Sequence, residues 1–226
     1  MSSTAGSALC AAVLCLVAAP YLAGLTRTLP DCDAARWWRG TRVAPARLAA
    51  TAVAGLALGA LGGAAAGWSA LLPAFVALAL AATPLVVIDC ELHRLPDRLV
   101  VPAAVAGAAL LAVAAVPDGD WHALLRALEA AFAVCTVLLV LRLVSPNSFG
   151  LGDVKLGAIL GGYLGWFGWV HVGYGIFAGF LLGAMVSIAL VAARRATMKT
   201  HVPFGPMLIF GAMLVLAFDL VPAGAR

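Results

Sequence analysis

Eight apolar runs, separated by short polar or Pro/Gly-rich breaks, divide the chain. They cover residues 4–26, 47–67, 69–88, 99–116, 122–144, 152–167, 171–193 and 204–221. A helix needs about 20 apolar residues to cross the hydrocarbon core of a bilayer, and most of the runs come close to that length. The pattern predicts an all-α, polytopic membrane helix bundle of about eight transmembrane helices.

The composition indicates the same class of protein. Hydrophobic residues make up 64% of the chain and charged residues 11%, and the mean hydropathy is +1.07. A soluble domain has roughly 45–50% apolar and about 25% charged residues. We therefore expect a single integral membrane domain over residues 1–226, without a separate soluble domain.

The basic residues predict how the helices are oriented. No Lys or Arg precedes the first apolar run and Arg27 follows it, the reverse of the charge order of a secretory signal. We expect an uncleaved first helix with its N-terminus outside. Twelve of the fourteen basic residues then lie on the inner side, in agreement with the positive-inside rule: Arg27, Arg36, Arg39, Arg42, Arg47, Arg94, Arg98, Arg142, Lys155, Arg194, Arg195 and Lys199. The net charge of +4 then requires no nucleic acid partner.

The cysteines and histidines predict neither disulfides nor a metal site. Three of the five cysteines lie within apolar runs, and Cys32 and Cys90 lie on the predicted inner side, where thiols stay reduced. The inner loop 27–47 holds one cysteine, so a four-cysteine zinc site is excluded there. The four histidines are far apart in the sequence or on opposite sides of the membrane: His93, His122, His171 and His201.

Three glycine series recur at every fourth residue of an apolar run. They are Gly55, Gly59 and Gly63, then Gly157, Gly161 and Gly165, and finally Gly175, Gly179 and Gly183. Small residues at this spacing let the backbones of neighbouring helices come close. We interpret them as packing positions that hold the helix ends in place.

Two acids lie at helix ends on the predicted inner side. Asp89 follows the third apolar run, and Asp153 lies at the start of the sixth. An ionisable group costs roughly 2.5–3.5 kcal/mol at the centre of a membrane helix, and less near its end, so it suggests a functional site. The alternative for Asp153 is that it only caps its helix by accepting a backbone N–H.

The other acids are expected to be structural or solvated. Asp118 and Asp120 lie in an outer loop, and Asp219 lies near the outer end of the last run. Glu129 lies one helical turn from Arg126 and can pair with it.

Two carboxylates brought together can share a proton, because like charges in contact do not both ionise easily. One can then act as a base toward water while the other protonates a carbonyl oxygen, which is peptide hydrolysis without a metal. The helix dipoles favour Asp153 as the ionised partner, since it lies at the positive end of its helix and Asp89 at the negative end.

The residues around both acids resemble a known family. Gly150-Leu151-Gly152-Asp153 resembles the GxGD signature of intramembrane aspartyl proteases, and its extension through Val154-Lys155-Leu156 resembles the bacterial prepilin peptidases. In that family the first catalytic aspartate begins a segment that ends in Pro-Asp or Pro-Asn, which matches Asp89 and then Pro96-Asp97. A third similar stretch, residues 202–206, opens the last run.

The resemblance implies the roles of the site residues. Asp89 and Asp153 would be catalytic, and Asp97 a structural neighbour. The residues that would bind substrate or shape the site are Gly150, Gly152, Lys155, Pro96, Asp97, Pro203, Phe204, Gly205 and Pro206. Lys155 would attract an acidic residue of the substrate, or else only anchor its helix at the membrane interface.

The resemblance also implies an activity. Prepilin peptidases cleave the leader from type IV pilin-like precursors at the cytoplasmic face of the bacterial inner membrane, usually between a glycine and the apolar helix of the mature subunit. The expected partners are a prepilin or pseudopilin precursor and the lipid bilayer, with no cofactor. Larger members have a cysteine-rich inner domain linked with N-methylation, where this chain has a short loop with Trp37 and Trp38. The resemblance therefore implies only the peptidase activity for this chain.

The sequence also bears on other classes of function. An ion-coupled transporter would also carry intramembrane carboxylates, but no pair of broken helices marks the midplane. A non-catalytic membrane protein that binds pilin precursors is a further alternative. A serine protease lacks a nucleophile motif, since Ser145 and Ser148 lie in an ordinary Pro-Asn turn. Gly150 and Gly152 lack the third glycine of a dinucleotide site.

Overall fold

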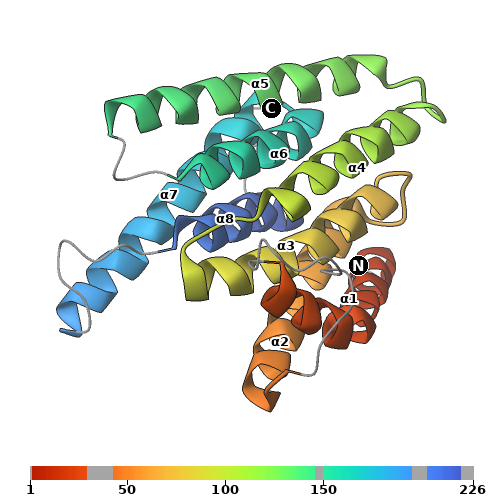
Figure 1. The fold of residues 1–226 in the computed structure, drawn as a ribbon. Coiled ribbons are helices and arrows are strands. Elements are labelled where there is room, and N and C mark those ends of the chain that lie inside the picture. Colours follow the sequence, from red (N-terminus) through yellow and green to blue (C-terminus); the bar gives the residue numbers. More distant parts are fainter. Residues whose placement is uncertain (1, 30–42, 146–149, 195–202, 220–226) are drawn as a thin grey trace.

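The computed structural model of the chain describes residues 2–29, 43–145, 150–194 and 203–219. These residues form eight helices and no strand (Figure 1). The helices are α1 (Ser2–Thr28), α2 (Pro45–Ala66), α3 (Leu72–Leu92), α4 (Asp97–Ala115), α5 (Trp121–Val144), α6 (Leu151–Phe167), α7 (Trp169–Ala192) and α8 (Phe204–Phe218). The predicted all-α bundle is confirmed, with each helix within a few residues of its apolar run. Trp37, Trp38, Cys32, Ser148, His201 and Val202 lie outside the described residues.

Six of the helices are long and apolar enough to cross a membrane by length and composition. The other two, α6 and α8, have 17 and 15 described residues. At 1.5 Å per residue they are about 25 and 22 Å long. Both are largely buried, whereas only 22% of the apolar window of α5 and 11% of that of α7 is buried. The two short helices therefore form the interior of the bundle, and longer ones surround them.

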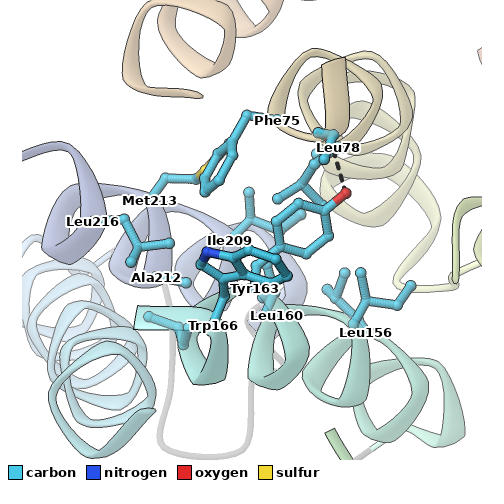
Figure 2. Close-up of a cluster of buried hydrophobic side chains, with 14 of the residues drawn as sticks. Phe75, Leu78, Leu156, Leu160, Tyr163, Trp166, Ile209, Ala212, Met213 and Leu216 are labelled. Carbon is cyan, nitrogen blue, oxygen red and sulfur yellow. Dashed lines mark hydrogen bonds between the residues drawn. The ribbon is translucent and has the colours of Figure 1, made fainter. Parts of the chain in front are cut away.

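The core lies where α3, α6 and α8 meet (Figure 2). The Tyr163 hydroxyl of α6 donates a hydrogen bond of 2.8 Å to the carbonyl oxygen of Ala74 in α3. Its ring packs edge-on against Phe75, with 5.2 Å between the ring centroids. The labelled side chains around this contact come from the same three helices: Leu78, Leu156, Leu160, Trp166, Ile209, Ala212, Met213 and Leu216. The three helices that carry the core are also the ones whose ends carry the candidate site.

The glycine series lie at close helix contacts, as predicted. A Cβ on Gly59 would lie 2.7 Å from the carbonyl oxygen of Ala11 in α1. A Cβ on Gly179 would lie 2.9 Å from the Cα of Leu208 in α8. The series on α6 lies against α5 in the same way, so a methyl group at Gly161 would meet Val134 at 2.9 Å. Side chains at these positions would push the helices apart.

Arg126 does not pair with Glu129 as the sequence suggested. Its Nε donates a hydrogen bond of 2.7 Å to the carbonyl oxygen of Gly165, and its Nη2 donates to that of Trp166. These carbonyls end α6, where the helix dipole favours a cation. The interaction therefore fixes the start of α5 to the end of α6, opposite the end that carries Asp153.

Candidate active site

Asp89 lies in the last turn of α3. The helix is apolar from Leu85 to Ile88, and it ends at His93, which has a left-handed backbone with φ 52° and ψ 39°. The N–H of His93 donates a 2.9 Å hydrogen bond to the carbonyl oxygen of Asp89 and so closes the last turn. The Asp89 side chain is only 5% exposed. A carboxyl group is thereby held in the interior, just inside the helix end.

Asp153 lies in the first turn of α6. Its Oδ2 accepts a hydrogen bond of 3.1 Å from the backbone N–H of Gly150, the residue before the helix. The capping role that the sequence left open is therefore present. The Asp153 side chain is nevertheless 9% exposed, far more buried than a cap requires. The capping hydrogen bond uses only Oδ2 of Asp153, so capping does not explain why the whole carboxyl group is buried.

The start of α8 brings a third helix to the two acids. The backbone N–H of Gly205 donates a hydrogen bond of 3.1 Å to Oδ2 of Asp89. A Cβ on Gly205 would lie 2.9 Å from that oxygen and 3.5 Å from Cδ2 of Leu156, one turn beyond Asp153. The structure therefore places the helix ends that carry the two predicted acids at one end of the bundle, and each acid accepts one backbone N–H.

The first turn of α8 adds a second helix dipole at Asp89. The sequence assigned the charge to Asp153, because it alone was expected to face the positive end of a helix. Asp89 ends α3, but its Oδ2 accepts an N–H from the first turn of α8, which is also a positive helix end. At Asp89 the positive end of α8 therefore opposes the negative end of α3, whereas Asp153 faces the positive end of α6 as expected.

Lys155 and Asp97 form an ion pair beside the acids. The Lys155 Nζ lies 2.6 Å from Oδ1 of Asp97, and the two side chains are 42% and 64% exposed. Asp97 is the first residue of α4 and follows Pro96, whose extended backbone precedes the helix. The pair joins the starts of α4 and α6, two residues from Asp153, so the structure gives Lys155 a partner within the chain.

The loop between α3 and α4 packs directly on the start of α6. A Cβ on Gly152 would lie 2.6 Å from Cβ of Leu95, so only glycine fits here without a shift. This contact places the Asp89 end of α3 beside the Asp153 end of α6. Sequence reasoning missed Leu95, and a lone apolar residue in a polar loop was the only available signal.

The stretch that opens α8 is arranged to present the Gly205 amide. Pro203 precedes the helix with an extended backbone, and Pro206 lies in its first turn, where a missing N–H is tolerated. The Phe204 ring packs against Phe180 of α7, with 4.9 Å between the centroids. The predicted site residues of this stretch therefore lie at the same end of the bundle as the two acids.

Residues missed from the sequence also surround the site. His93 closes the last turn of α3 with its backbone N–H, although the sequence gave it no role beyond excluding a metal. Arg47 lies 2.5 Å from Glu91 and ties the start of α2 to the last turn of α3. Within the described ranges, no group of three or more His, Cys, Asp or Glu residues has metal-binding geometry.

Comparison with known proteins identifies the family. A sequence model of the type IV leader peptidase family matches residues 74–193, which is more than half of the chain. This chain belongs to the type IV leader peptidase family. The matched segment contains both Asp89 and Asp153, and it ends before α8. The resemblance seen in the sequence is confirmed at the level of the family.

Curated relatives of this family member carry one name. A prepilin leader peptidase/N-methyltransferase of Pseudomonas putida is 34% identical over 139 residues, 60% of this chain and 46% of the relative. A protein of the same name from Aeromonas salmonicida is 30% identical over 152 residues, 66% of this chain and 50% of the relative. The chain spans about half the length of the curated relatives it matches. No solved structure matches it.

Proposed function

We propose that this member of the type IV leader peptidase family is a membrane-embedded aspartic endopeptidase. Its substrates would be type IV pilin-like precursors, from which it removes the leader. The observation that carries the proposal is the burial of Asp89 and Asp153, two acids whose helix ends meet at one end of the bundle within the family-matched segment. Buried ionisable groups are rare in a membrane bundle and usually mark a functional site.

The proposed reaction uses the two carboxyls in complementary roles. One carboxylate takes a proton from water as the water oxygen attacks the carbonyl carbon of the scissile peptide bond. The other carboxyl gives its proton to the carbonyl oxygen. When the tetrahedral intermediate collapses, the C–N bond breaks, the nitrogen leaves as an amine after protonation, and the pair regains one shared proton. The N–H groups of Gly150 and Gly205 hold the two side chains in place during these steps.

The proposal includes the location and the extent of the enzyme. We place it in the bacterial inner membrane as a single integral domain over residues 1–226, with the acids on the cytoplasmic side. The support is the concentration of Lys and Arg at that end of the helices. The proposal covers the peptidase activity, and it does not extend to the N-methyltransferase activity in the names of the relatives. The ion pair between Lys155 and Asp97 is proposed to hold the shape of the site.

The experiment that tests the proposal compares precursor processing in matched variants. A pilin-like precursor from the same organism is co-expressed with the wild type, Asp89→Asn or Asp153→Asn, and its size is measured. Each substitution removes an ionisable group while keeping its shape, so each is expected to abolish the shift to the mature size. Asp118→Asn, in the exposed turn after α4, is the control and should process normally. If both site variants still process the precursor, the proposed enzymatic function is refuted, and a protein that only binds precursors is favoured.

A further inference from the structure

Arg47 contacts two other helices at the end of the bundle that carries Asp89. Its Nη2 donates a hydrogen bond of 2.5 Å to Oε2 of Glu91 in the last turn of α3, and its Nη1 donates one of 3.3 Å to Oγ1 of Thr26 in the last turn of α1. Thr26 is only 1% exposed, and its hydroxyl donates in turn to the carbonyl oxygen of Ala23. One guanidinium therefore joins the start of α2 to the ends of α1 and α3.

Neither charge of the pair between Arg47 and Glu91 is favoured by its own helix. Arg47 is the third residue of α2, so its positive charge lies at the positive end of that helix dipole. Glu91 is the next-to-last residue of α3, so its negative charge lies at the negative end. Each charge is compensated by the other rather than by its own helix. The pair is therefore a feature of how α2 packs on α3, not of either helix alone.

Pro84 weakens the connection between the end of α3 and the rest of the helix. A proline has no N–H, so inside the helix it leaves the Leu80 carbonyl oxygen without its intrahelical donor. Helices bend most readily at such positions. Residues 85–92, which include Asp89, therefore depend on neighbouring helices for their place in the bundle more than a continuous helix would.

Glu91 and Asp89 point to different sides of α3. At about 100° per residue, Ile88 and Glu91 lie within about 60° of one another on the helix surface, whereas Asp89 lies about 160° from Glu91. Ile88 packs in a small apolar cluster with the end of α1, and Glu91 pairs with Arg47. Asp89 faces α8. Arg47 therefore holds the turn from the side opposite the carboxyl group of Asp89.

We infer that Arg47 is a positioning residue of the site: through Glu91 it holds the last turn of α3 so that Asp89 meets the first turn of α8. The inference rests on the proposed function. The two side chains are 26% and 40% exposed, so the pair adds little to global stability. Its effect is local, because helix ends open more easily than the core. The competing role is an anchor to a lipid phosphate, but the carboxylate of Glu91 beside the guanidinium would repel that phosphate.

Matched variants separate the two roles of Arg47. Arg47→Met and Glu91→Gln each break the pair, so a positioning role requires both to act alike, whereas a lipid anchor requires only Arg47. The double variant, Arg47→Glu with Glu91→Arg, rebuilds the pair with both charges at the favourable ends of their helices. Arg94→Met is the control, because it removes the same charge from the exposed loop after α3.

The first measurement does not depend on catalysis. Hydrogen exchange of the backbone amides of residues 89–93 is followed by mass spectrometry in phosphatidylcholine vesicles. Arg47→Met and Glu91→Gln should each speed this exchange about fivefold, the factor that corresponds to a partly exposed ion pair. The double variant and Arg94→Met should exchange like the wild type. Unchanged exchange in both single variants would overturn the inference, and faster exchange in Arg47→Met alone would assign Arg47 to a lipid phosphate instead.

The second measurement is the kinetics of precursor cleavage. Arg47→Met and Glu91→Gln should each lower kcat about tenfold, because a displaced carboxyl group slows the chemical step. KM should stay within about twofold of the wild-type value, since the contacts that bind the substrate are kept. The double variant should recover kcat, and the thermal unfolding temperature should change little in all variants.

The kinetic outcomes also distinguish the inference from the proposed function. Faster exchange at the end of α3 with wild-type kcat would overturn the positioning role while leaving the peptidase intact. An equal loss of kcat in Arg94→Met would overturn it as well, because charge alone would then explain the effect. A wild type that cleaves no precursor would refute the proposed function, and the exchange data would still decide whether Arg47 holds the end of α3.

Discussion

The backbone N–H of Gly205 lies 3.1 Å from Oδ2 of Asp89, so the start of α8 is bonded to the end of α3. The two residues are 116 positions apart in the chain. Gly150 makes the equivalent contact with Asp153 within its own helix start. One acid is therefore held locally and the other by a distant helix, which makes the geometry of the pair dependent on how α8 packs.

Gly205→Ala is expected to lower kcat about tenfold, because an added methyl group would lie 2.9 Å from Oδ2 of Asp89 and force the carboxyl to move. The measurement is kcat for precursor cleavage, together with the thermal unfolding temperature. Gly173→Ala on α7 is the control, since its Cβ would have no neighbour within 4 Å. Wild-type kcat in Gly205→Ala would show that the contact does not position Asp89.

The pH dependence of cleavage should be bell-shaped. A pair that works with one shared proton is inactive when both carboxyls are protonated and when both are ionised. The two limbs belong to the pair, so neither is assigned to Asp89 or Asp153 alone. The measurement is kcat/KM against pH in vesicles, with a stability check at each pH. A profile without a limb on the acidic side would contradict the carboxyl pair.

The sequence was enough to predict the helices and to place the two acids at the same end of the bundle. Apolar runs of membrane length specify helices almost regardless of their neighbours, since the backbone must satisfy its own hydrogen bonds in lipid. Successive helices reverse direction, which places the end of α3 and the start of α6 on one side. The positions of Asp89 and Asp153 then follow from counting helices.

The partners of the site residues could not be predicted in this way. The bond from Gly205 to Asp89 depends on which helices pack together, and every run is similarly apolar, so hydropathy does not show that α6 and α8 are interior. Arg126 was matched with Glu129 because they are neighbours on one helix, but the free carbonyls that end α6 are its partners. The sequence also does not show that Asp97, 58 positions before Lys155, lies 2.6 Å from the Lys155 ammonium.

The pair between Lys155 and Asp97 should matter for site geometry more than for global stability. Both side chains are more than a third exposed, so the pair contributes at most about 1 kcal/mol to the free energy of unfolding. Lys155→Met and Asp97→Asn are each expected to lower kcat/KM by a similar, modest factor. The charge-swapped double variant, Lys155→Asp with Asp97→Lys, should recover part of it. A larger effect of Lys155→Met, with no recovery in the swap, would instead indicate direct contact with the substrate.

Tyr163→Phe tests whether the core between α3 and α6 supports the site from a distance. The substitution removes the 2.8 Å hydrogen bond to the Ala74 carbonyl oxygen but keeps the ring against Phe75. The loss should be roughly 0.5–1.5 kcal/mol of the free energy of unfolding. The lower end is expected, because a carbonyl inside a helix retains its intrahelical partner. Thermal unfolding in detergent measures this loss, and Tyr174→Phe on the exposed face of α7 is the matched control.

The activity of Tyr163→Phe should change little. Because the acids are held by Gly150 and Gly205, kcat should stay near the wild-type value. A fall in kcat at unchanged stability would mean that the hydroxyl acts on the site itself.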